Sequence, residues 1–347
     1  MSERGSDGLV AGLGEGGVLV SPEEAVRFAD MSHKAVFGEV MEGLAREGRE
    51  LSVVVSDYGR RLNLGGLREL FPDAFVQCGI AEQNQLEVAS ALANEGFCTF
   101  APSYATFITA RVLDQIRVNL GIMRSPVMLV GVSCGCDSAI LGASHMALED
   151  VACTRSIPGM VVASPSDNAE FAAVLRWLAA NPRPAYVRMN EPLANLHPEG
   201  VSSIEGVGVL REAASPDLVL VASGTMAATA VEAAEALAGR GVETRVLGLP
   251  LVKPLAGDAL LRRIAGVRLV ATLEEHGVVG GLGGAVAELL ADRGAGVPLL
   301  RLGMPDAYQA ADTRERILSL CELDAPGVVT SVLKRLEGDR LLARRTN

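Results

Sequence analysis

The sequence lacks a surplus of basic residues. Its 347 residues carry 31 Lys and Arg against 42 Asp and Glu, which gives a formal net charge of -11. Nucleic acid is therefore not expected as the main partner, because neutralising its phosphates requires a basic surface. Histidine is also scarce, with four residues in the whole chain.

Long apolar stretches are missing as well. No unbroken run reaches the roughly 18 apolar residues that a membrane-spanning helix needs, so no membrane contact is expected. The opening MSERGSDGLVAGLGEGGVLV lacks the basic start and apolar segment of a signal peptide. Its GLGEGG follows no strand and opens no helix. We interpret residues 1–21 as a flexible tail rather than a dinucleotide site.

The cysteines follow no regular spacing. In a long chain with 49% apolar residues, this favours a packed protein of the reducing cytoplasm over a disulfide framework. Cys134-Gly-Cys136 has no second ligand pair at zinc-like spacing, so we interpret it as a loop lined by small residues and predict no metal site. The six cysteines are Cys78, Cys98, Cys134, Cys136, Cys153 and Cys321.

Short apolar runs alternate with longer amphipathic runs from about residue 22 onward. Strands are predicted over 51–57, 74–79, 126–132, 159–164 and 184–189, and helices over 23–47, 82–96, 106–121 and 168–181. Val-rich strands that alternate with helices indicate a mostly parallel sheet covered on both faces.

A segment rich in Pro and Gly, residues 192–216, interrupts this alternation, which then resumes. We predict an α/β protein with two doubly wound, mostly parallel sheets, in domains spanning 22–191 and 217–347. Ser223-Gly224-Thr225 lies between a strand and a helix. It has the form of an anion site at a helix N-terminus, but an ordinary capped helix start is the favoured interpretation.

Glu82, in the stretch QCGIAEQNQLEVASALANEG, lies where a short apolar run gives way to a helix. Burial at such a junction would disfavour ionisation and raise the pKa of a carboxyl group, which suits a residue that exchanges protons. The alternative is a partly exposed glutamate that the helix dipole favours. Position alone leaves both interpretations open.

Four blocks resemble the pyrimidine-binding domain of the transketolase family in order and spacing: GIAEQN, APSYATFITARVLDQIR, GASHMALEDVACTRSIPGMVVASPSD and PAYVRMNEP. The second half, with VASGTMAATAVEAAEALAGRGVETRVLGLPLVKPL and ATLEEHGVVGGLGGAVAELL, is similar to the C-terminal domain of transketolases and deoxyxylulose-phosphate synthases. The resemblance implies a cofactor, thiamine diphosphate.

The resemblance also implies roles for single residues. Glu82 would hydrogen-bond N1′ of the cofactor's aminopyrimidine, and Phe107 would stack on that ring. Asp57 would lie near the cofactor at a subunit interface. His145 would reach the donor's carbonyl and first hydroxyl, where an imidazole can move protons near neutral pH. For Phe107 the alternative is an ordinary core position.

Two basic residues match positions that bind substrate phosphate in the family. Arg188 offers the planar guanidinium that suits a phosphate, with a salt bridge at the sheet edge as the alternative. Lys34 stands where transketolases often carry an arginine. Asp114 and Arg117 are expected to pair with each other on the helix or across an interface.

The sequence departs from the family at several positions. Ser133 replaces a histidine that helps to bind phosphate, and Leu141 replaces an aspartate that contacts a donor hydroxyl. Ala110 and Leu113 replace two aromatic residues. A lost hydrogen bond to a charged group costs about 1.5–3 kcal/mol. We therefore expect a donor that lacks a phosphate, or lacks a hydroxyl at the matched carbon.

No segment matches the diphosphate-binding domain with its G-D-G motif. We therefore expect the second subunit of a split transketolase, which moves a two-carbon ketol unit from a ketose-type donor to an aldehyde acceptor. A separate chain would supply the diphosphate pocket and the Mg²⁺ ligands, in a heterotetramer of two copies of each chain. The alternatives are a beta subunit of a 2-oxo-acid dehydrogenase or acyl-transferring synthase, and a non-catalytic scaffold.

Overall fold

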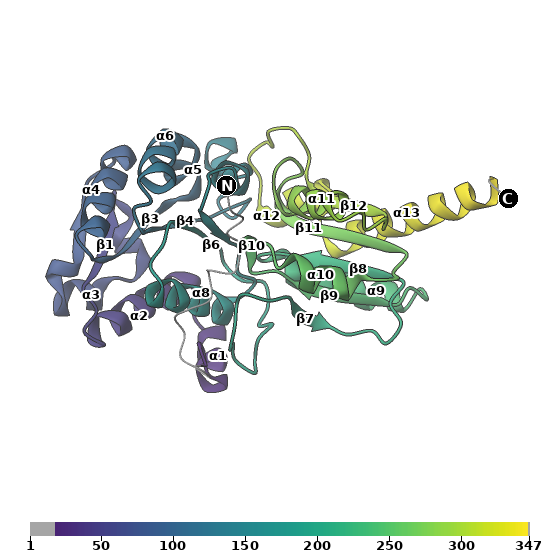
Figure 1. The fold of residues 1–347 in the computed structure, drawn as a ribbon, viewed down its shortest axis with the longest axis horizontal. Coiled ribbons are helices and arrows are strands. Elements are labelled where there is room, and N and C mark those ends of the chain that lie inside the picture. The colour runs from purple at the N-terminus through teal and green to yellow at the C-terminus, as the bar shows by residue number, and fades with distance from the viewer. Residues whose placement is uncertain (1–17, 346–347) are drawn as a thin grey trace, which may run out of the picture.

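The computed structural model describes residues 18–345 (Figure 1). Residues 1–17 of the predicted tail lie outside the described residues. The rest of that tail is not loose. Val20 forms an antiparallel bridge with Val201, and the Ser21 side chain accepts a hydrogen bond from the backbone N–H of Glu24 at the start of α1 (Pro22–Ala29).

The first sheet confirms the predicted mostly parallel architecture. Its seven strands run in the order β10-β5-β6-β4-β3-β1-β2, and every neighbouring pair is parallel except β10 with β5. The strands are β1 (Leu51–Val55), β2 (Phe75–Gln77), β3 (Cys98–Tyr104), β4 (Val127–Val132), β5 (Val161–Ala163), β6 (Ala185–Met189) and β10 (Leu251–Lys253).

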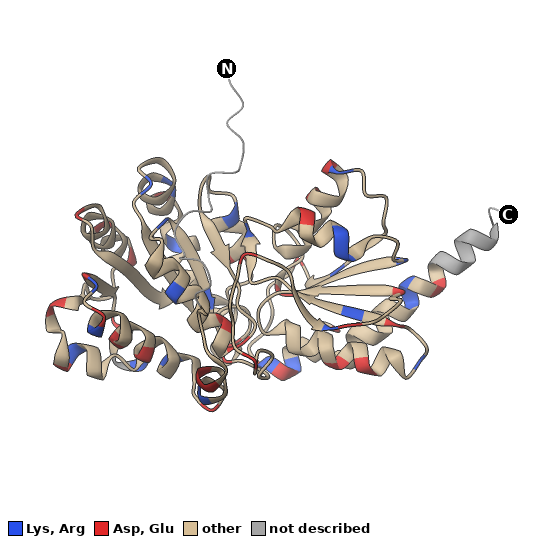
Figure 2. Cartoon of the chain, turned by 60° about the horizontal axis from the view of Figure 1, so that its bottom comes forward, with Lys and Arg blue, Asp and Glu red and all other residues tan. Residues whose placement is uncertain are grey.

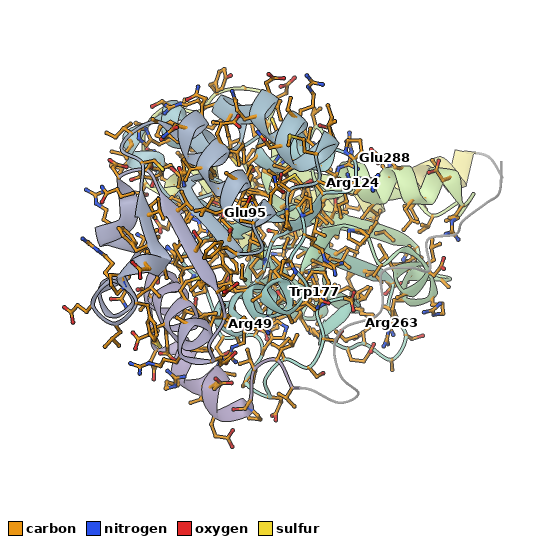
Figure 3. The ribbon with its side chains drawn as sticks, turned by 60° about the vertical axis from the view of Figure 1, so that its left-hand side comes forward. Arg49, Glu95, Arg124, Trp177, Arg263 and Glu288 are labelled. Atoms are coloured by element: carbon orange, nitrogen blue, oxygen red, sulfur yellow. The ribbon has the colours of Figure 1, made fainter. Side chains whose placement is uncertain are left out.

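Alternating residues of this sheet face two separate helical layers. Val53 and Val55 pack with α1, α2 (His33–Arg46) and α8 (Asn168–Ala180), whereas Val54 packs with α4 (Glu82–Asn94) on the opposite face. The Arg49 side chain donates a 3.0 Å hydrogen bond to the carbonyl of Ala179, near the end of the helix that carries Trp177 (Figure 3). Helices α3 (Gly65–Leu70) and α7 (Asp150–Arg155) also belong to this domain.

Two of the predicted helices are interrupted. The segment 23–47 forms α1 and α2 rather than one helix, because the Ser32 hydroxyl caps a new helix start by accepting from the N–H of Ala35. The segment 106–121 forms α5 (Ala105–Ile108), a 3₁₀ turn (Ala110–Val112), α6 (Leu113–Gln115) and a π-helical stretch (Ile116–Ile122). Such irregular helical turns are common beside functional sites.

The second sheet has five strands in the order β12-β11-β8-β9-β7. They are β7 (Gly208–Arg211), β8 (Leu218–Ala222), β9 (Thr244–Gly248), β11 (Leu269–Gly277) and β12 (Leu299–Met304). One face packs against α9 (Met226–Ala238), α12 (Arg314–Leu320) and α13 (Ala325–Arg345), and the other against α10 (Gly257–Ile264) and α11 (Leu282–Asp292). Lys and Arg are scattered among Asp and Glu in both domains (Figure 2).

Two strands differ from the predicted division of the chain. β7 lies within the predicted linker 192–216 but pairs antiparallel with β9 of the second sheet. β10 lies beyond that linker but completes the edge of the first sheet beside β5 (Figure 1). Each sheet therefore has an edge strand that comes from outside the predicted range of its domain. Within residues 18–345, no helix combines the length and the apolarity needed to cross a bilayer.

The segment that joins the domains is held to α8 by one carboxylate. Asp167 accepts hydrogen bonds from the backbone N–H groups of Leu196 and His197, at 2.8 and 2.9 Å, and from Nδ1 of His197 at 3.0 Å. Burial acts to lower the pKa of His197, but the bond to Asp167 and the nearby Glu170 outweigh it and raise this pKa to about 8.

This pair predicts a pH-dependent part of the stability. The folded-state pKa of His197 lies above its unfolded value, so its contribution is fully present below about pH 6.5 and is lost as the pH rises through about 8. We expect His197→Gln to lower the free energy of unfolding by up to about 2 kcal/mol at pH 6. Thermal melts of both proteins at pH 6 and pH 9 measure this. An equal gap in melting temperature at the two pH values would contradict it.

Candidate active site

The candidate site lies at the carboxyl ends of the parallel strands, near the centre of the first sheet. The chain leaves β1 toward β2 on one side and leaves β3 toward β4 on the other, so the strand order reverses between β1 and β3. Open α/β sheets bind their ligands in the crevice at this point. The hydroxyls of Ser56 and Ser103, which lie at these two strand ends, are 3.3 Å apart.

Glu82 lies at this edge as the first residue of α4. The turn before it places Gly79 at a φ of 77°, a conformation that favours glycine. The residue is only 3% exposed, so it is buried and not the partly exposed helix-start glutamate of the alternative interpretation. Its Oε2 atom accepts a 2.9 Å hydrogen bond from Nη1 of Arg111 in an ion pair.

Aromatic rings surround the same point. The ring of Phe107 meets those of Tyr104 and His145 edge-to-face, with centroids 5.8 and 5.3 Å apart. Tyr104 and His145 are themselves 5.3 Å apart. The guanidinium of Arg111 lies 3.8 Å from the centroid of Phe107. Arg111 thus joins Glu82 to Phe107, and Phe107 contacts His145 directly.

Arg111 and Tyr104 were not predicted from the sequence. Arg111 follows Phe107 by four residues, a spacing that places two side chains on one face of a regular helix, whereas Tyr104 is the last residue of β3 and has no such relation to Phe107. The helix predicted over 106–121 breaks between α5 and the 3₁₀ turn, so regular helical spacing did not identify Arg111 as a site residue. Ala110 and Leu113 lie in the same irregular segment, and Arg117 pairs with Asp114 at 3.0 Å, as one of the two predicted arrangements.

Asp57 and Lys34 lie outside this chain of contacts. Asp57 follows β1 and is exposed, with its carboxylate 3.5 Å from the Ser56 hydroxyl. Lys34 lies in the first turn of α2, beside the buried His33, whose Nδ1 pairs with the carboxylate of Glu191. Burial is the main cause that lowers the pKa of His33.

Arg188 is buried in an ion pair. Its Nε and Nη2 atoms donate to both carboxylate oxygens of Asp150, at 2.8 and 3.2 Å, and Nη2 also donates to the carbonyls of Ala147 and Glu275. The hydroxyl of Tyr186 donates to Asp150 at 2.6 Å. The alternative of a salt bridge is therefore present, although β6 lies inside the sheet and not at its edge. Phosphate binding by Arg188 stays a prediction.

A second buried ion pair lies within the second domain and is hydrogen-bonded to the first. Arg314 donates to the carboxylate of Glu275, which also accepts from the N–H of Cys136 at 2.7 Å and the hydroxyl of Thr225 at 3.1 Å. Thr225 immediately precedes α9 but makes no side-chain cap, so the ordinary capped start predicted for this turn is wrong. The Thr225 hydroxyl donates its hydrogen bond to the Glu275 carboxylate instead. A Cβ on Gly135 would lie 2.7 Å from the Glu275 side chain.

Cys134 and Cys136 lie in the loop that follows β4, where both are buried as small apolar side chains. Burial raises the pKa values of the Cys134 and Cys136 thiols to about 12. The thiol of Cys134 donates to the carbonyl of Gly131 at 3.0 Å. All six cysteines are unpaired.

Ser133 and Leu141, which replace polar residues of the family pattern, lie in different environments. Ser133 is buried, and its N–H donates to the carbonyl of Met189. Leu141 is 52% exposed in the turn before His145, and its neighbour Ile140 is also exposed. The side chain present where a hydroxyl-binding aspartate was expected is therefore apolar and accessible.

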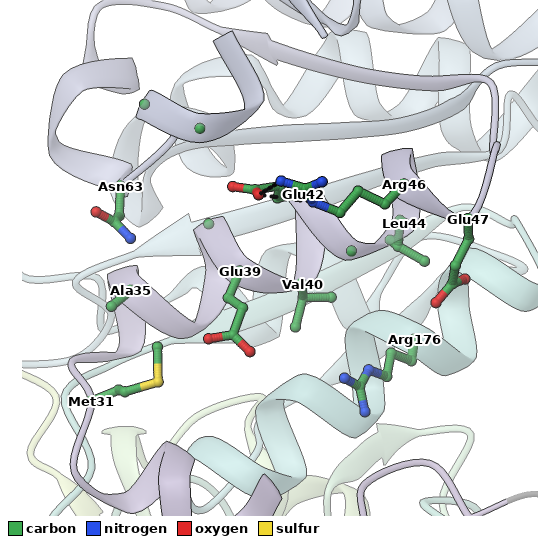
Figure 4. Close-up of a pocket in the computed structure, with 14 residues that line it drawn as sticks. Met31, Ala35, Glu39, Val40, Glu42, Leu44, Arg46, Glu47, Asn63 and Arg176 are labelled. Carbon is green, nitrogen blue, oxygen red and sulfur yellow. Dashed lines mark hydrogen bonds and ion pairs between the residues drawn. The ribbon is translucent and has the colours of Figure 1, made fainter. Parts of the chain in front are cut away.

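A hollow of about 410 Å³ lies elsewhere, along α2 and the start of α3 (Figure 4). None of the predicted site residues lines it. Most of its charges are already paired, since Glu42 binds Arg46, Glu39 binds Arg27, and Arg176 binds Glu24, while Glu47 also lines it. Nothing in this hollow offers a reactive group, so we assign it no part in the site.

The residues at the strand ends fit the aminopyrimidine of thiamine diphosphate. The buried carboxylate of Glu82 and the face of the Phe107 ring both contact Arg111 there, and they match the hydrogen-bonding edge and the flat face of such a ring. Across residues 18–345, no cluster of three or more His, Cys, Asp or Glu side chains is arranged to hold a metal ion.

Two family models match the chain. Residues 29–196 match "Transketolase, pyrimidine binding domain", and residues 207–328 match "Transketolase, C-terminal domain". The chain is 30% identical over 302 residues to one of the subunits of the apulose-4-phosphate transketolase of Phocaeicola vulgatus, across 86% of this chain and 95% of that protein.

Two further proteins are similar over most of their length. A subunit of the 6-deoxy-6-sulfo-D-fructose transketolase of Clostridium sp. is 36% identical over 239 residues, which span 68% of this chain and 73% of that protein. A solved structure titled "Split gene transketolase, inactive beta4 tetramer" superposes with a TM-score of 0.80 at 31% identity, and 88% of this chain covers 98% of it.

The Asp150–Arg188 pair predicts a large stability effect that needs no substrate. Arg188→Met would leave Asp150 as an uncompensated buried charge, so we expect the free energy of unfolding to fall by about 3–5 kcal/mol. Arg117→Met, which breaks the exposed pair with Asp114, is the matched control and should cost less than about 1 kcal/mol. Thermal or urea melts distinguish them, and similar melting of both variants would contradict the prediction.

Proposed function

Because the chain belongs to the transketolase family, we propose that it is one subunit of a split transketolase that uses thiamine diphosphate. The observation that carries this proposal is a buried carboxylate, Glu82, linked through Arg111 to the ring of Phe107 at the carboxyl ends of the strands. Bound cofactor would supply the carbon nucleophile that moves a two-carbon ketol unit from a ketose-type donor to an aldehyde acceptor.

In this proposal, the residues of this chain bind and orient the aminopyrimidine and the donor. Glu82 holds the proton at ring nitrogen N1′ of the aminopyrimidine, and its burial keeps water away from that hydrogen bond. Phe107 supports the face of the same ring. His145, fixed edge-to-face by Phe107 and Tyr104 and 3.1 Å from the Ser144 hydroxyl, moves a proton at the donor's first hydroxyl. Asp57 lines the subunit interface near the cofactor.

A separate diphosphate-binding subunit completes the site. It supplies the pocket for the diphosphate and the ligands of Mg²⁺, and two copies of each chain form the enzyme. Support comes from the relatives, which are named as single subunits and match this chain over most of their length. We place the enzyme in the cytoplasm because six unpaired cysteines suit a reducing compartment.

The donor differs from the common sugar phosphates. Leu141 offers no hydrogen bond to a donor hydroxyl, and Ser133 is buried. Arg188 donates to Asp150 and to two carbonyls, and Lys34 supplies a point charge without a planar fork. The two relatives are named for apulose 4-phosphate and 6-deoxy-6-sulfo-D-fructose, which supports an unusual sugar as the donor here.

A second candidate is an acyl-transferring synthase subunit. The exposed Leu141 favours it, since a 2-oxo acid has no hydroxyl at the carbon that an aspartate would contact. Turnover by the reconstituted enzyme with ketose donors and with pyruvate separates the two candidates.

The role of Glu82 predicts a loss of catalysis. We expect Glu82→Gln to lower turnover of the reconstituted complex by about 10²–10⁴-fold, because the amide cannot hold the same proton. Glu95→Gln, at the opposite end of α4 (Figure 3), is the matched control and should leave turnover unchanged. Equal activity of both variants would favour the scaffold hypothesis.

The division of the site predicts dependence on the partner. The isolated chain should bind thiamine diphosphate weakly, with no response to Mg²⁺, and should show no turnover. Adding the diphosphate-binding subunit should produce Mg²⁺-dependent binding in a calorimetric titration. Full activity from the isolated chain would refute the split-site proposal.

A further inference from the structure

Arg111 makes two contacts that have no part in the proposed reaction. Its guanidinium lies 3.8 Å from the centroid of the Phe107 ring, and its Nη1 donates a 2.9 Å hydrogen bond to Oε2 of Glu82. The first contact is a cation–π stack and the second is an ion pair. The residue lies in the 3₁₀ turn between α5 and α6.

These are the two contacts proposed for the cofactor's aminopyrimidine. A flat group with N–H donors rests on Phe107 and binds Glu82, as the cofactor ring would. The rings of Tyr104 and His145 also contact the Phe107 ring in T-shaped arrangements. The guanidinium and the aminopyrimidine would therefore compete for the same face of Phe107 and for the same carboxylate.

We propose that Arg111 is a displaceable placeholder for the cofactor ring, which occupies the Glu82–Phe107 site until the aminopyrimidine enters. This inference rests on the proposed function and deepens it. The placeholder keeps the buried carboxylate paired, since an unpaired buried charge is costly. It also covers a ring that would otherwise face water.

The position of Arg111 permits it to leave. Its side chain is 41% exposed, whereas that of Glu82 is 4% exposed, so the guanidinium can exchange its two contacts for water. A long arginine side chain needs only rotations about its own bonds to move. Glu82, held in the first turn of α4, stays in place.

The proposal is tested on the full-length chain with thiamine, which carries the aminopyrimidine without the diphosphate. Ligand-detected NMR titrations measure the affinity. We expect Arg111→Ala to bind thiamine about tenfold more tightly than the unchanged protein, because no cation has to be displaced. Arg111→Lys keeps the charge but cannot stack as a plane, so its affinity should fall between the two.

Arg117→Ala is the matched control. Arg117 lies six residues further on, pairs with Asp114 and does not touch Phe107 or Glu82, so its removal should leave the affinity unchanged. Adding Glu82→Gln to Arg111→Ala should reverse the gain, which would locate the thiamine at this site. Thermal melts of every variant confirm that each one is folded.

Equal or weaker binding by Arg111→Ala would overturn the placeholder, and so would an equal gain in Arg117→Ala. Absence of thiamine binding to every variant would overturn it as well. The proposed function is judged separately. If Glu82→Gln abolishes turnover of the reconstituted complex while Arg111→Ala gains no affinity, the placeholder fails and the function stands. If Glu82→Gln leaves turnover unchanged, the function fails.

Discussion

Two buried ion pairs hold the loop on which the whole site depends. Arg188 binds Asp150 and the carbonyl of Ala147, and Arg314 binds Glu275, which accepts the N–H of Cys136. Cys136 and Ala147 lie on either side of His145 along the chain, so the loop is fixed from both ends. The imidazole, which ends a short 3₁₀ turn (Ala143–His145), is then held against Tyr104 and Phe107.

Fixing a loop with buried charges carries a large desolvation cost. A buried ion pair seldom adds net stability, because desolvating both charges offsets their attraction. Such a pair instead fixes the orientation of the loop, since a planar guanidinium can bind a carboxylate and two carbonyls in few arrangements. Arg188 on β6 and Glu275 on β11 come from different sheets, so the same contacts orient the two domains. Apolar packing alone would leave more freedom at this junction.

Much of the fold could be predicted from the sequence, but the exceptions are informative. Two mostly parallel sheets followed from Val-rich runs between amphipathic helices. β3 was missed because Thr99, Pro102 and Ser103 interrupt its apolar pattern, although it lies in the middle of the sheet. Of the candidate site, the structure buries Glu82 and links it through Arg111 to Phe107 and His145, and the roles of these residues stay predictions. Arg111 was missed although it follows Phe107 by four residues, because its partner Glu82 comes from another helix 29 residues away in the chain.

The edge strand β10 makes the two domains physically inseparable. It follows the linker in the chain, yet its backbone closes the open side of β5 in the first sheet. A shortened protein that ended in the linker would expose a row of unpaired amide and carbonyl groups along β5, and such an edge is a template for intermolecular strand pairing. Dissecting this chain at its apparent boundary would therefore produce an aggregating fragment rather than an independent pyrimidine-binding module.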